Sequence, residues 1–283
     1  MSSSRTVLIT GCSTGIGRAS ALRLDAAGWR VFAGVRKEED AESIAAAGSD
    51  RLQPVIVDVT DSASIDLCRE RVEKDCPEGV YGLVNNAGAA HVGPLEVMPL
   101  EDMRRQFEVN FVGHVAMTQA LVPSLRKTKG RIVNVTSVGG LVSTPFFGPY
   151  CASKYALEAV SDCLRVDLRP WGIKTIAIEP GSVATEIWES GTQIFAELRE
   201  ELGPEAIELY GDALEATARA AAETGKRGIP AEHAAEVVER ALTARRPRAR
   251  YLVGRDAYGM TAAKRLLPAK LHDRLTARVL RLP

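Results

Sequence analysis

The sequence predicts an α/β protein built on a parallel β-sheet with helices on both faces. Between residue 7 and about residue 180, short apolar runs alternate with amphipathic stretches long enough to form helices. Such an alternation is typical of βαβ units, whose right-handed crossovers cover both faces of a sheet. A glycine-rich turn follows the first apolar run. The 283 residues fit one α/β domain, so we expect a single domain over residues 1–283.

Each expected strand is a short run rich in apolar and β-branched residues. The strands are residues 7–9, 31–35, 54–57, 81–84, 131–135, 174–178 and 251–253. Between them, the helices are a first one that opens at the glycine-rich turn, then residues 38–47, 62–76, 100–126 and a helix that contains Tyr150 and runs to about residue 169. Gly28, Gly130 and Pro170 mark stops between these elements.

The pattern changes after residue 181. Helices are expected over residues 186–224, with turns at Gly191 and at Gly203 with Pro204, and over residues 230–244. Apolar side chains among charges in residues 186–225 suit a mobile lid over an apolar pocket, and the alternative is a helix packed on the sheet. Residues 255–283 form a basic helical extension, whose stretch 259–281 is broken by Pro268.

Composition and charge exclude several classes of protein. Hydrophobic content is 46%, charged content is 25% and the net charge is zero, which fits a globular protein and gives no global attraction to nucleic acid. Residues 245–283 hold eleven Lys/Arg against two Asp. This tail could rest on an anionic membrane surface, but we favour packing on its own domain. Five cysteines without metal-ligand spacing, and neither a secretory signal nor a bilayer-spanning run, indicate a cytoplasmic protein.

The glycine-rich turn predicts a dinucleotide site. Glycines let the backbone turn tightly and approach a pyrophosphate, and the N-terminus of the following helix offers free N–H groups to the phosphates. The residues expected at this site are Gly11, Ser13, Thr14, Gly15, Ile16 and Gly17. The alternative is a tight turn that binds no ligand.

The end of the second strand bears on the choice of cofactor. An acidic residue there would hold the 2′-hydroxyl of NAD, whereas an arginine accommodates the 2′-phosphate of NADP. This chain has Arg36 and Lys37, so NADP(H) is favoured over NAD(H), unless Arg36 is only a solvated surface residue. Asp58 and Val59 could hold the adenine, or simply end a strand before Thr60 caps a helix.

Polar residues also follow the fourth and fifth strands. Asn86, Ala87 and Gly88 suit a loop that lines a cofactor, although asparagine and glycine are common in any turn. Asparagine is unfavourable inside a helix, so Asn110 is a candidate functional residue. The alternative is that it is a tolerated local defect of the helix. Ser137 could hydrogen-bond a substrate carbonyl, or could cap a helix.

Tyr150 and Lys154 predict proton-transfer chemistry. On a helix, residues i and i+4 lie on one face, so both heads can reach one reacting centre. A nearby cation lowers the pKa of a phenol, and bringing it from about 10 to about 7 takes about 4 kcal/mol, which a lysine together with an oxidised nicotinamide ring could supply. The pair therefore suits proton exchange with an alcohol or carbonyl oxygen. Tyr155, the other tyrosine beside Lys154, is expected to pack.

Together these motifs resemble the short-chain dehydrogenase/reductase family over about residues 5–185. The resemblance implies a Rossmann-type doubly wound parallel sheet, a nicotinamide cofactor, and a tetrad of Asn110, Ser137, Tyr150 and Lys154. It also implies that Thr185 and the backbone near Val183 hold the nicotinamide carboxamide, and that Pro180 and Gly181 belong to the same cofactor-binding segment. The sequence around Tyr150 resembles the branch of this family that acts on steroids, retinoids and related lipophilic alcohols.

This resemblance implies a hydride-transferring oxidoreductase that acts on a lipophilic small molecule. In reduction Tyr150 would donate a proton while Ser137 binds the carbonyl oxygen, and in oxidation Tyr150 would act as the base. Lys154 would hold the nicotinamide ribose, and Asn110 would fix a water that links Lys154 to solvent. A homodimer or homotetramer is the family expectation. The alternative from another class is a catalytically silent, dinucleotide-binding redox sensor.

Overall fold

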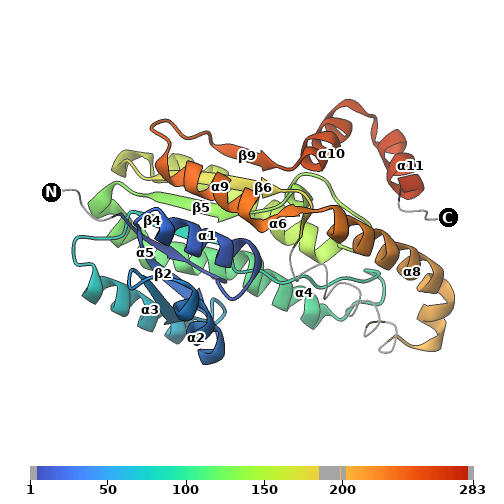
Figure 1. Cartoon of the computed structure of the whole chain (residues 1–283). Helices are drawn as coiled ribbons and strands as arrows, with labels where there is room; N and C mark the ends of the chain where they lie inside the picture. Colours follow the sequence, from blue (N-terminus) through green and yellow to red (C-terminus); the bar gives the residue numbers. More distant parts are fainter. Residues whose placement is uncertain (1–4, 185–197, 199–201, 280–283) are drawn as a thin grey trace.

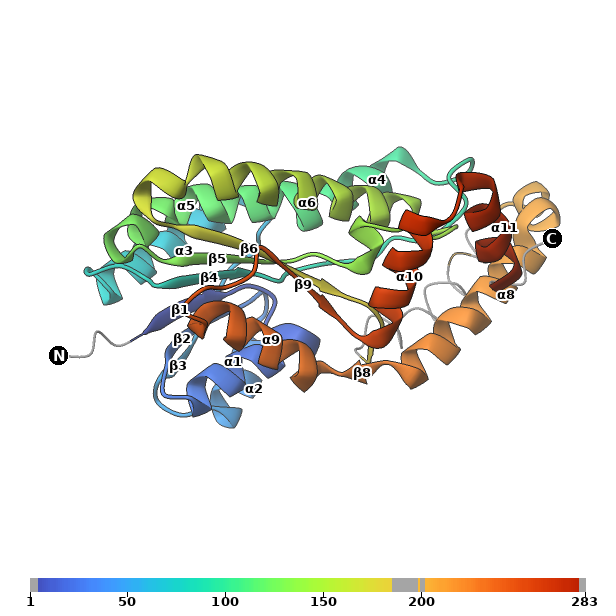
Figure 2. The same cartoon turned by 90° about the horizontal axis from the view of Figure 1, so that it is seen from above.

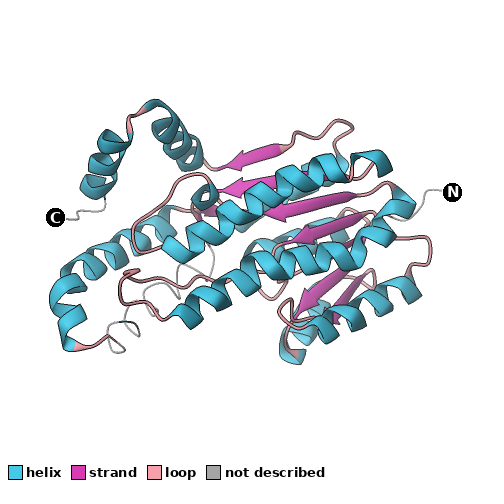
Figure 3. Ribbon diagram, turned by 180° about the vertical axis from the view of Figure 1, so that it is seen from behind, coloured by secondary structure: helices cyan, strands magenta, loops and turns pink. Residues whose placement is uncertain are grey.

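A parallel sheet forms the centre of the protein, with the strand order β3-β2-β1-β4-β5-β6-β9. In this computed structural model, residues 5–184, 198 and 202–279 are described. The strands of the sheet are β1 (Thr6–Ile9), β2 (Arg30–Val35), β3 (Leu52–Ile56), β4 (Gly82–Asn85), β5 (Arg131–Val135), β6 (Lys174–Pro180) and β9 (Arg250–Val253). All of the predicted strands are present, and their arrows point the same way (Figure 3).

The strand order reverses at β1, which pairs with β2 on one side and with β4 on the other. Chain connections therefore run outward from β1 in both directions, which leaves a crevice at the carboxyl ends of these strands. The doubly wound, Rossmann-type prediction is confirmed, and it locates the crevice at the glycine-rich turn that follows β1.

Helices cover both faces of the sheet (Figure 2). One face carries α3 (Ser62–Asp75), α4 (Leu100–Phe107), α5 (Gly113–Thr128) and α6 (Gly148–Asp167), and the other carries α1 (Gly15–Ala26), α2 (Glu38–Ala47) and α9 (Ala231–Thr243). Side chains of one strand point alternately to the two faces. Val7 and Ile9 accordingly pack in the cluster with α1 and α9, whereas Leu8 packs in the cluster with α3 and α5.

The helix expected over residues 100–126 is not continuous. A π-helical turn, Glu108–Val112, separates α4 from α5, and Asn110 lies in the middle of it. The Asn110 Oδ1 accepts a hydrogen bond from Ala89 N at 2.9 Å, and its Nδ2 donates to Ala89 O at 3.0 Å. A wider turn at a side chain that reaches outside its helix is typical of functional sites.

The carboxyl-terminal part extends from the carboxyl end of the sheet. It contains β7 (Val183–Ala184), α8 (Pro204–Arg227), β8 (Ile229–Pro230), α10 (Arg255–Leu266) and α11 (Ala269–Val279). The helix α8 begins at the predicted turn, and α10 and α11 meet at the predicted break at Pro268 (Figure 1). The pairing of β7 with β8 was not predicted. Most of the expected helix over residues 186–203 lies outside the described residues.

Among the described residues, no helix has both the length and the apolarity that crossing a bilayer demands. The same residues contain no His/Cys/Asp/Glu group that could hold a metal ion.

Candidate active site

A cavity of about 990 Å³ lies at the carboxyl ends of the strands. Most of the residues predicted from the sequence line it: Gly11, Ser13, Thr14, Gly15, Ile16, Arg36, Asp58, Val59, Asn86, Ala87, Gly88, Ser137, Tyr150, Lys154, Pro180, Gly181 and Val183. Gly17 and Asn110 lie behind the wall and do not line the cavity. Thr185 lies outside the described residues. Segments far apart in the sequence thus converge on one site.

The glycine-rich turn has the conformation that phosphate binding needs. Gly11 and Gly15 have φ angles of +69° and +54°, in the left-handed region that favours glycine. A Cβ on Gly17 would lie only 2.1 Å from the carbonyl oxygen of Gly11. The helix α1 has no acidic residue in its first turn, and its N-cap Thr14 makes no side-chain capping bond. The free N–H groups at the start of α1 therefore fit the phosphates of a dinucleotide.

Hydrogen bonds from the end of β4 hold this turn in shape. The Asn86 Nδ2 donates to the carbonyl oxygens of Thr10 and Gly11, both at 3.0 Å. In return, Thr10 Oγ1 accepts from the backbone N–H groups of Asn86 and Ala87, also at 3.0 Å. The side chain of Asn86 thus serves the architecture of the turn. Thr10 had no role assigned from the sequence.

Arg36 lies at the edge of the cavity after β2. Its side chain is exposed and forms no ion pair with any described residue, whereas Lys37 pairs with Glu39 at 2.8 Å. Asp58 Oδ1 accepts from the N–H and the hydroxyl of Thr60 at 2.9 and 2.7 Å. Burial alone would raise the pKa of Asp58, but these bonds and the charge of Arg36 lower it. The guanidinium of Arg36 is therefore free to bind another anion here.

The N-cap expected of Thr60 is instead made by Asp61, whose Oδ1 accepts from Ala63 N at 3.0 Å. The alternative interpretation, in which Thr60 caps the helix, was therefore wrong about the capping residue. Asp58 and Thr60 instead form a local turn that faces the cavity.

Tyr150 and Lys154 lie one turn apart on α6, and both line the cavity. The Lys154 Nζ is 5.9 Å from the centroid of the Tyr150 ring and donates to Val135 O at 3.0 Å. Burial lowers the pKa of Lys154 from 10.5 to about 8. Burial also raises the pKa of Tyr150, and only a hydrogen bond with Ser137 opposes this. Lys154 alone therefore does not lower the pKa of this buried phenol, and the lowering expected from the lysine together with an oxidised nicotinamide ring stays a prediction.

Ser137 stands beside Tyr150 at the start of a 3₁₀ turn, Val138–Gly140. Its Oγ accepts from Gly139 N at 3.0 Å and is hydrogen-bonded to the phenol. A Cβ on Gly139 would lie 3.1 Å from the ring of Tyr150, and one on Gly140 would lie 2.9 Å from Lys154 O. Glycine at both positions lets the serine turn approach α6 closely.

The loop after β4 is held from behind by buried polar side chains. Besides its bonds to Ala89, Asn110 Nδ2 donates to Ser153 Oγ at 3.2 Å. Gln106 Nε2 donates to Ala89 O at 2.7 Å, and His114 Nε2 lies 2.6 Å from Ala87 O. Burial lowers the pKa of His114 to about 3, so this ring is neutral. Gln106 and His114 were missed, since nothing in their sequence spacing marks them.

The carboxyl-terminal helices supply further lining residues that the sequence did not reveal. They are Thr217, Ala220 and Ala221 of α8 and Asp256 and Met260 of α10. The only local signal near Asp256 is Gly254, which follows the last strand and precedes a helix.

Comparison with known proteins agrees with this geometry. Residues 5–194 match the family model described as short chain dehydrogenase. The chain is 34% identical to an NADPH-dependent 3-dehydrocapnine reductase of Ornithobacterium rhinotracheale, over 96% of this chain and 95% of the relative. It is 38% identical to human (Homo sapiens) retinol dehydrogenase 16, over 94% and 86%. The crystal structure of a short chain dehydrogenase from Burkholderia cenocepacia J2315 in complex with NADP is similar, with a TM-score of 0.74, 26% identity and coverage of 96% and 97%.

Proposed function

Because the chain belongs to the short-chain dehydrogenase family, we propose that it transfers hydride between NADP(H) and the carbonyl or alcohol carbon of a lipophilic small molecule. The observation that carries this proposal is the convergence of Ser137, Tyr150 and Lys154 in the cavity that the glycine-rich turn opens. When bound, the nicotinamide supplies hydride in reduction and accepts it in oxidation.

Tyr150 is the proposed acid and base. In reduction it donates its hydroxyl proton to the carbonyl oxygen of the substrate, and Ser137 donates a hydrogen bond to the same oxygen. Since burial raises the pKa of Tyr150, its hydroxyl is protonated at neutral pH, as an acid must be. The hydrogen bond with Ser137 favours the tyrosinate that remains after transfer. In oxidation Tyr150 accepts the proton of the alcohol.

Lys154 and Asn110 complete the proposed tetrad in different ways. The ammonium of Lys154 lies beside the phenol, where it stabilises a developing negative charge and would hold the hydroxyls of the nicotinamide ribose. Asn110 would fix a water that links Lys154 to solvent. Its observed bonds run to Ala89 and Ser153, so it also positions the loop beside Lys154.

The preference for NADP(H) rests on Arg36. A guanidinium without an ion pair among the described residues can bind a 2′-phosphate through charge-assisted hydrogen bonds. The NADPH dependence of the reductase from Ornithobacterium rhinotracheale supports the same choice. The residues proposed to hold the cofactor are Gly11, Ser13, Thr14, Gly15, Ile16, Gly17, Arg36, Asp58, Val59, Asn86, Ala87, Gly88, Tyr150, Lys154, Pro180, Gly181, Val183 and Thr185.

The lipophilic class of substrate rests on the wall that faces α8. Val92, Phe147 and Ala221 line the cavity and pack in one cluster with Phe146 and Leu214. Met260 also lines the cavity and packs against a second apolar cluster around Ala257. Burial of apolar surface is the main source of affinity in such a wall. The name of retinol dehydrogenase 16 supports this class.

We also propose a homodimer or homotetramer in the cytoplasm. The outer face of α6 exposes Ala152, Tyr155, Ala159 and Val166, and the last is 65% exposed. Small and apolar residues along one helix face suit a contact with a second copy. Light scattering coupled to gel filtration measures the state directly.

Tyr150→Phe tests the proposed function. The variant should bind NADPH as the wild type does and lose at least about a thousandfold in turnover. Tyr155→Phe is the matched control, because Tyr155 lies on the same helix but does not line the cavity. A panel of ketones and secondary alcohols is followed by NADPH absorbance. Normal turnover by Tyr150→Phe would remove Tyr150 as the acid, and a silent panel with tight cofactor binding would favour a redox sensor.

A further inference from the structure

The carboxylate of Asp256 lies against the turn that follows β6. Its Oδ2 accepts from Ser182 N at 2.6 Å. A Cβ on Gly181 would lie 2.5 Å from both carboxylate oxygens, and one on Gly254 would lie 2.5 Å from Oδ1. No side chain fits there, so the carboxylate occupies space that only glycine leaves at these two positions. Asp256 also lines the large cavity.

The strand β9 delivers Asp256 to this place. Its last residue, Val253, pairs with Pro180, and Gly254, with a φ of +99°, turns the chain into α10. Because the register of β9 on β6 is fixed, the start of α10 has a defined position beside the turn at 180–182.

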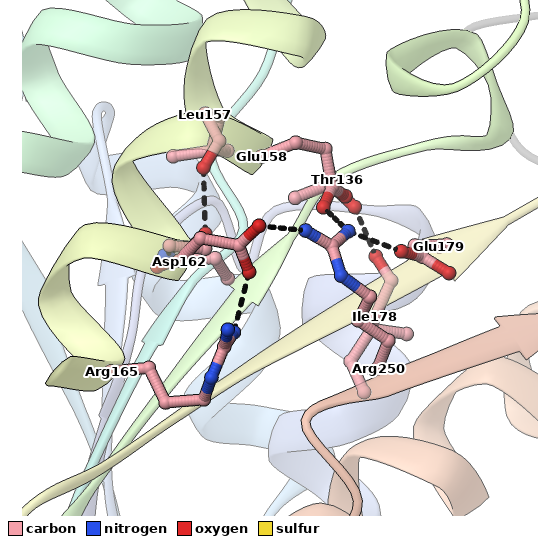
Figure 4. A network of polar contacts seen from close by, with 10 residues as sticks. Thr136, Leu157, Glu158, Asp162, Arg165, Ile178, Glu179 and Arg250 are labelled. Carbon is pink, nitrogen blue, oxygen red and sulfur yellow. Dashed lines mark hydrogen bonds and ion pairs between the residues drawn. The ribbon is translucent and has the colours of Figure 1, made fainter.

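A partly buried charge cluster fixes β9 itself (Figure 4). Arg250 Nη1 contacts Glu158 and, at 2.7 Å, Glu179, while Nη2 contacts Asp162 at 2.8 Å. Glu179 belongs to β6, and Glu158 follows Lys154 by one turn of α6. The carboxyl-terminal extension is therefore anchored both to the proposed catalytic helix and to the strand that precedes the turn.

This corner of the cavity is the nicotinamide end of the proposed cofactor site. The phosphates fit the start of α1 after β1, and the adenosine side lies toward β2 and β3, where Arg36 and Asp58 are found. In a doubly wound sheet the other half of the dinucleotide extends over the strands on the opposite side of the switch point. Those strands are β5 and β6. Ser137, which is hydrogen-bonded to Tyr150, follows β5, and Ser182, which is hydrogen-bonded to Asp256, follows β6.

We propose that Asp256 is a cofactor-positioning residue, which holds the turn at 180–182 and places a negative charge at the nicotinamide end of the site. This inference rests on the proposed function. The oxidised nicotinamide ring is positively charged and the reduced ring is neutral. The carboxylate therefore binds the oxidised cofactor more strongly than the reduced one, beyond its role in shaping the turn.

Asp256→Asn separates the charge from the shape, because the amide oxygen can still accept from Ser182 N. We expect affinity for NADP⁺ to fall on the order of tenfold, as the loss of a nearby unit charge implies, and affinity for NADPH to change by less than about twofold. Dissociation constants are measured by fluorescence titration of the full chain. Asp273→Asn is the control, because Asp273 lies in the same extension with its side chain 77% exposed.

The shape is tested by Asp256→Ala, which should weaken both forms of the cofactor, since Ser182 N loses its acceptor. Thermal unfolding without cofactor checks that each variant folds, and Asp256→Asn carries the test if the alanine variant does not fold. Equal losses for both forms, or none, in Asp256→Asn would overturn the inference. Failure of the wild type to bind either form would instead overturn the proposed function, so the two failures are distinguishable.

Discussion

Lys154→Met is expected to stabilise the folded protein at neutral pH while it removes turnover. Lys154 is 4% exposed, and burial lowers its pKa from 10.5 to about 8. The folded state thus binds this proton more weakly than the unfolded state does, which costs about 3 kcal/mol at pH 7. Methionine fills the same space without the charge. It also loses the hydrogen bond to Val135 O, worth about 1 kcal/mol, so the net gain is about 2 kcal/mol.

The pH dependence of this gain follows from the same two pKa values. The loss of stability that comes from burying the charge of Lys154 is complete below about pH 8. It disappears as the pH approaches 10.5, where this lysine becomes neutral in both the folded and the unfolded state. The unfolded state binds more protons in this window, so the stability of the wild type rises with pH. The advantage of the methionine variant should therefore shrink by about 2 kcal/mol between pH 7 and pH 9.5.

Urea denaturation at the two pH values, followed by tryptophan fluorescence, measures the difference. Lys264→Met is the matched control, because Lys264 is exposed on α10 and should show no such change. Turnover is measured with NADPH and any ketone that the wild type reduces. A methionine variant that is less stable than the wild type at pH 7, by an amount independent of pH, would refute the reasoning.

Further predictions concern the glycine-rich turn, the cofactor and the charge cluster around Arg250. Gly17→Ala should abolish cofactor binding in a fluorescence titration, because its Cβ would meet the Gly11 carbonyl at 2.1 Å. Gly211→Ala on α8 should bind normally, because its Cβ would make only an ordinary contact, 3.6 Å from the Ile207 side chain. Arg36→Gln should weaken NADPH on the order of tenfold and leave NADH unchanged, and an unaltered preference would count against Arg36. Burial raises the pKa of Glu179 above its usual 4.5 although the Arg250 guanidinium lies 2.7 Å away, so the folded state binds more protons than the unfolded state just above pH 4.5 and wild-type stability falls as pH rises there. Glu179→Gln should remove this slope in urea denaturation, and an identical slope would contradict the assignment.

The sheet and its main helices could be predicted because their signals are local. Val7, Leu8 and Ile9 form one apolar run, and the two faces of the strand are both buried, as in a central parallel strand. The π-helical turn could not be predicted, because it depends on bonds between Asn110 and Ala89, 21 residues away. The pairing of β7 with β8 was missed because two residues give no periodicity.

The residues of the candidate site also differ in whether a local sequence signal reveals them. The glycine-rich turn and the pair on α6 have fixed spacings, so the sequence indicates them. Asp256 could not be found, because its partner Ser182 lies 74 residues earlier and only the pairing of β9 with β6 joins them. The effect of burial on the pKa of Tyr150 could not be predicted, because the spacing of residues indicates neighbouring charges but not burial.

Burial lowers the pKa of Lys154 and raises that of Tyr150, and this combination affects how Tyr150 regains its proton after each reduction. Lysine ordinarily holds its proton slightly more tightly than tyrosine does. Here the pKa of Lys154 is lowered to about 8 and that of Tyr150 is raised, so the order is inverted. Once Tyr150 has given its proton to a carbonyl oxygen, transfer from the ammonium of Lys154 to the tyrosinate is favourable. The reductive turnover number should therefore fall as the pH rises through about 8, because Lys154 then has no proton to pass on. A reductive pH profile that stays flat to pH 10 would show that the proton of Tyr150 is replaced by another route.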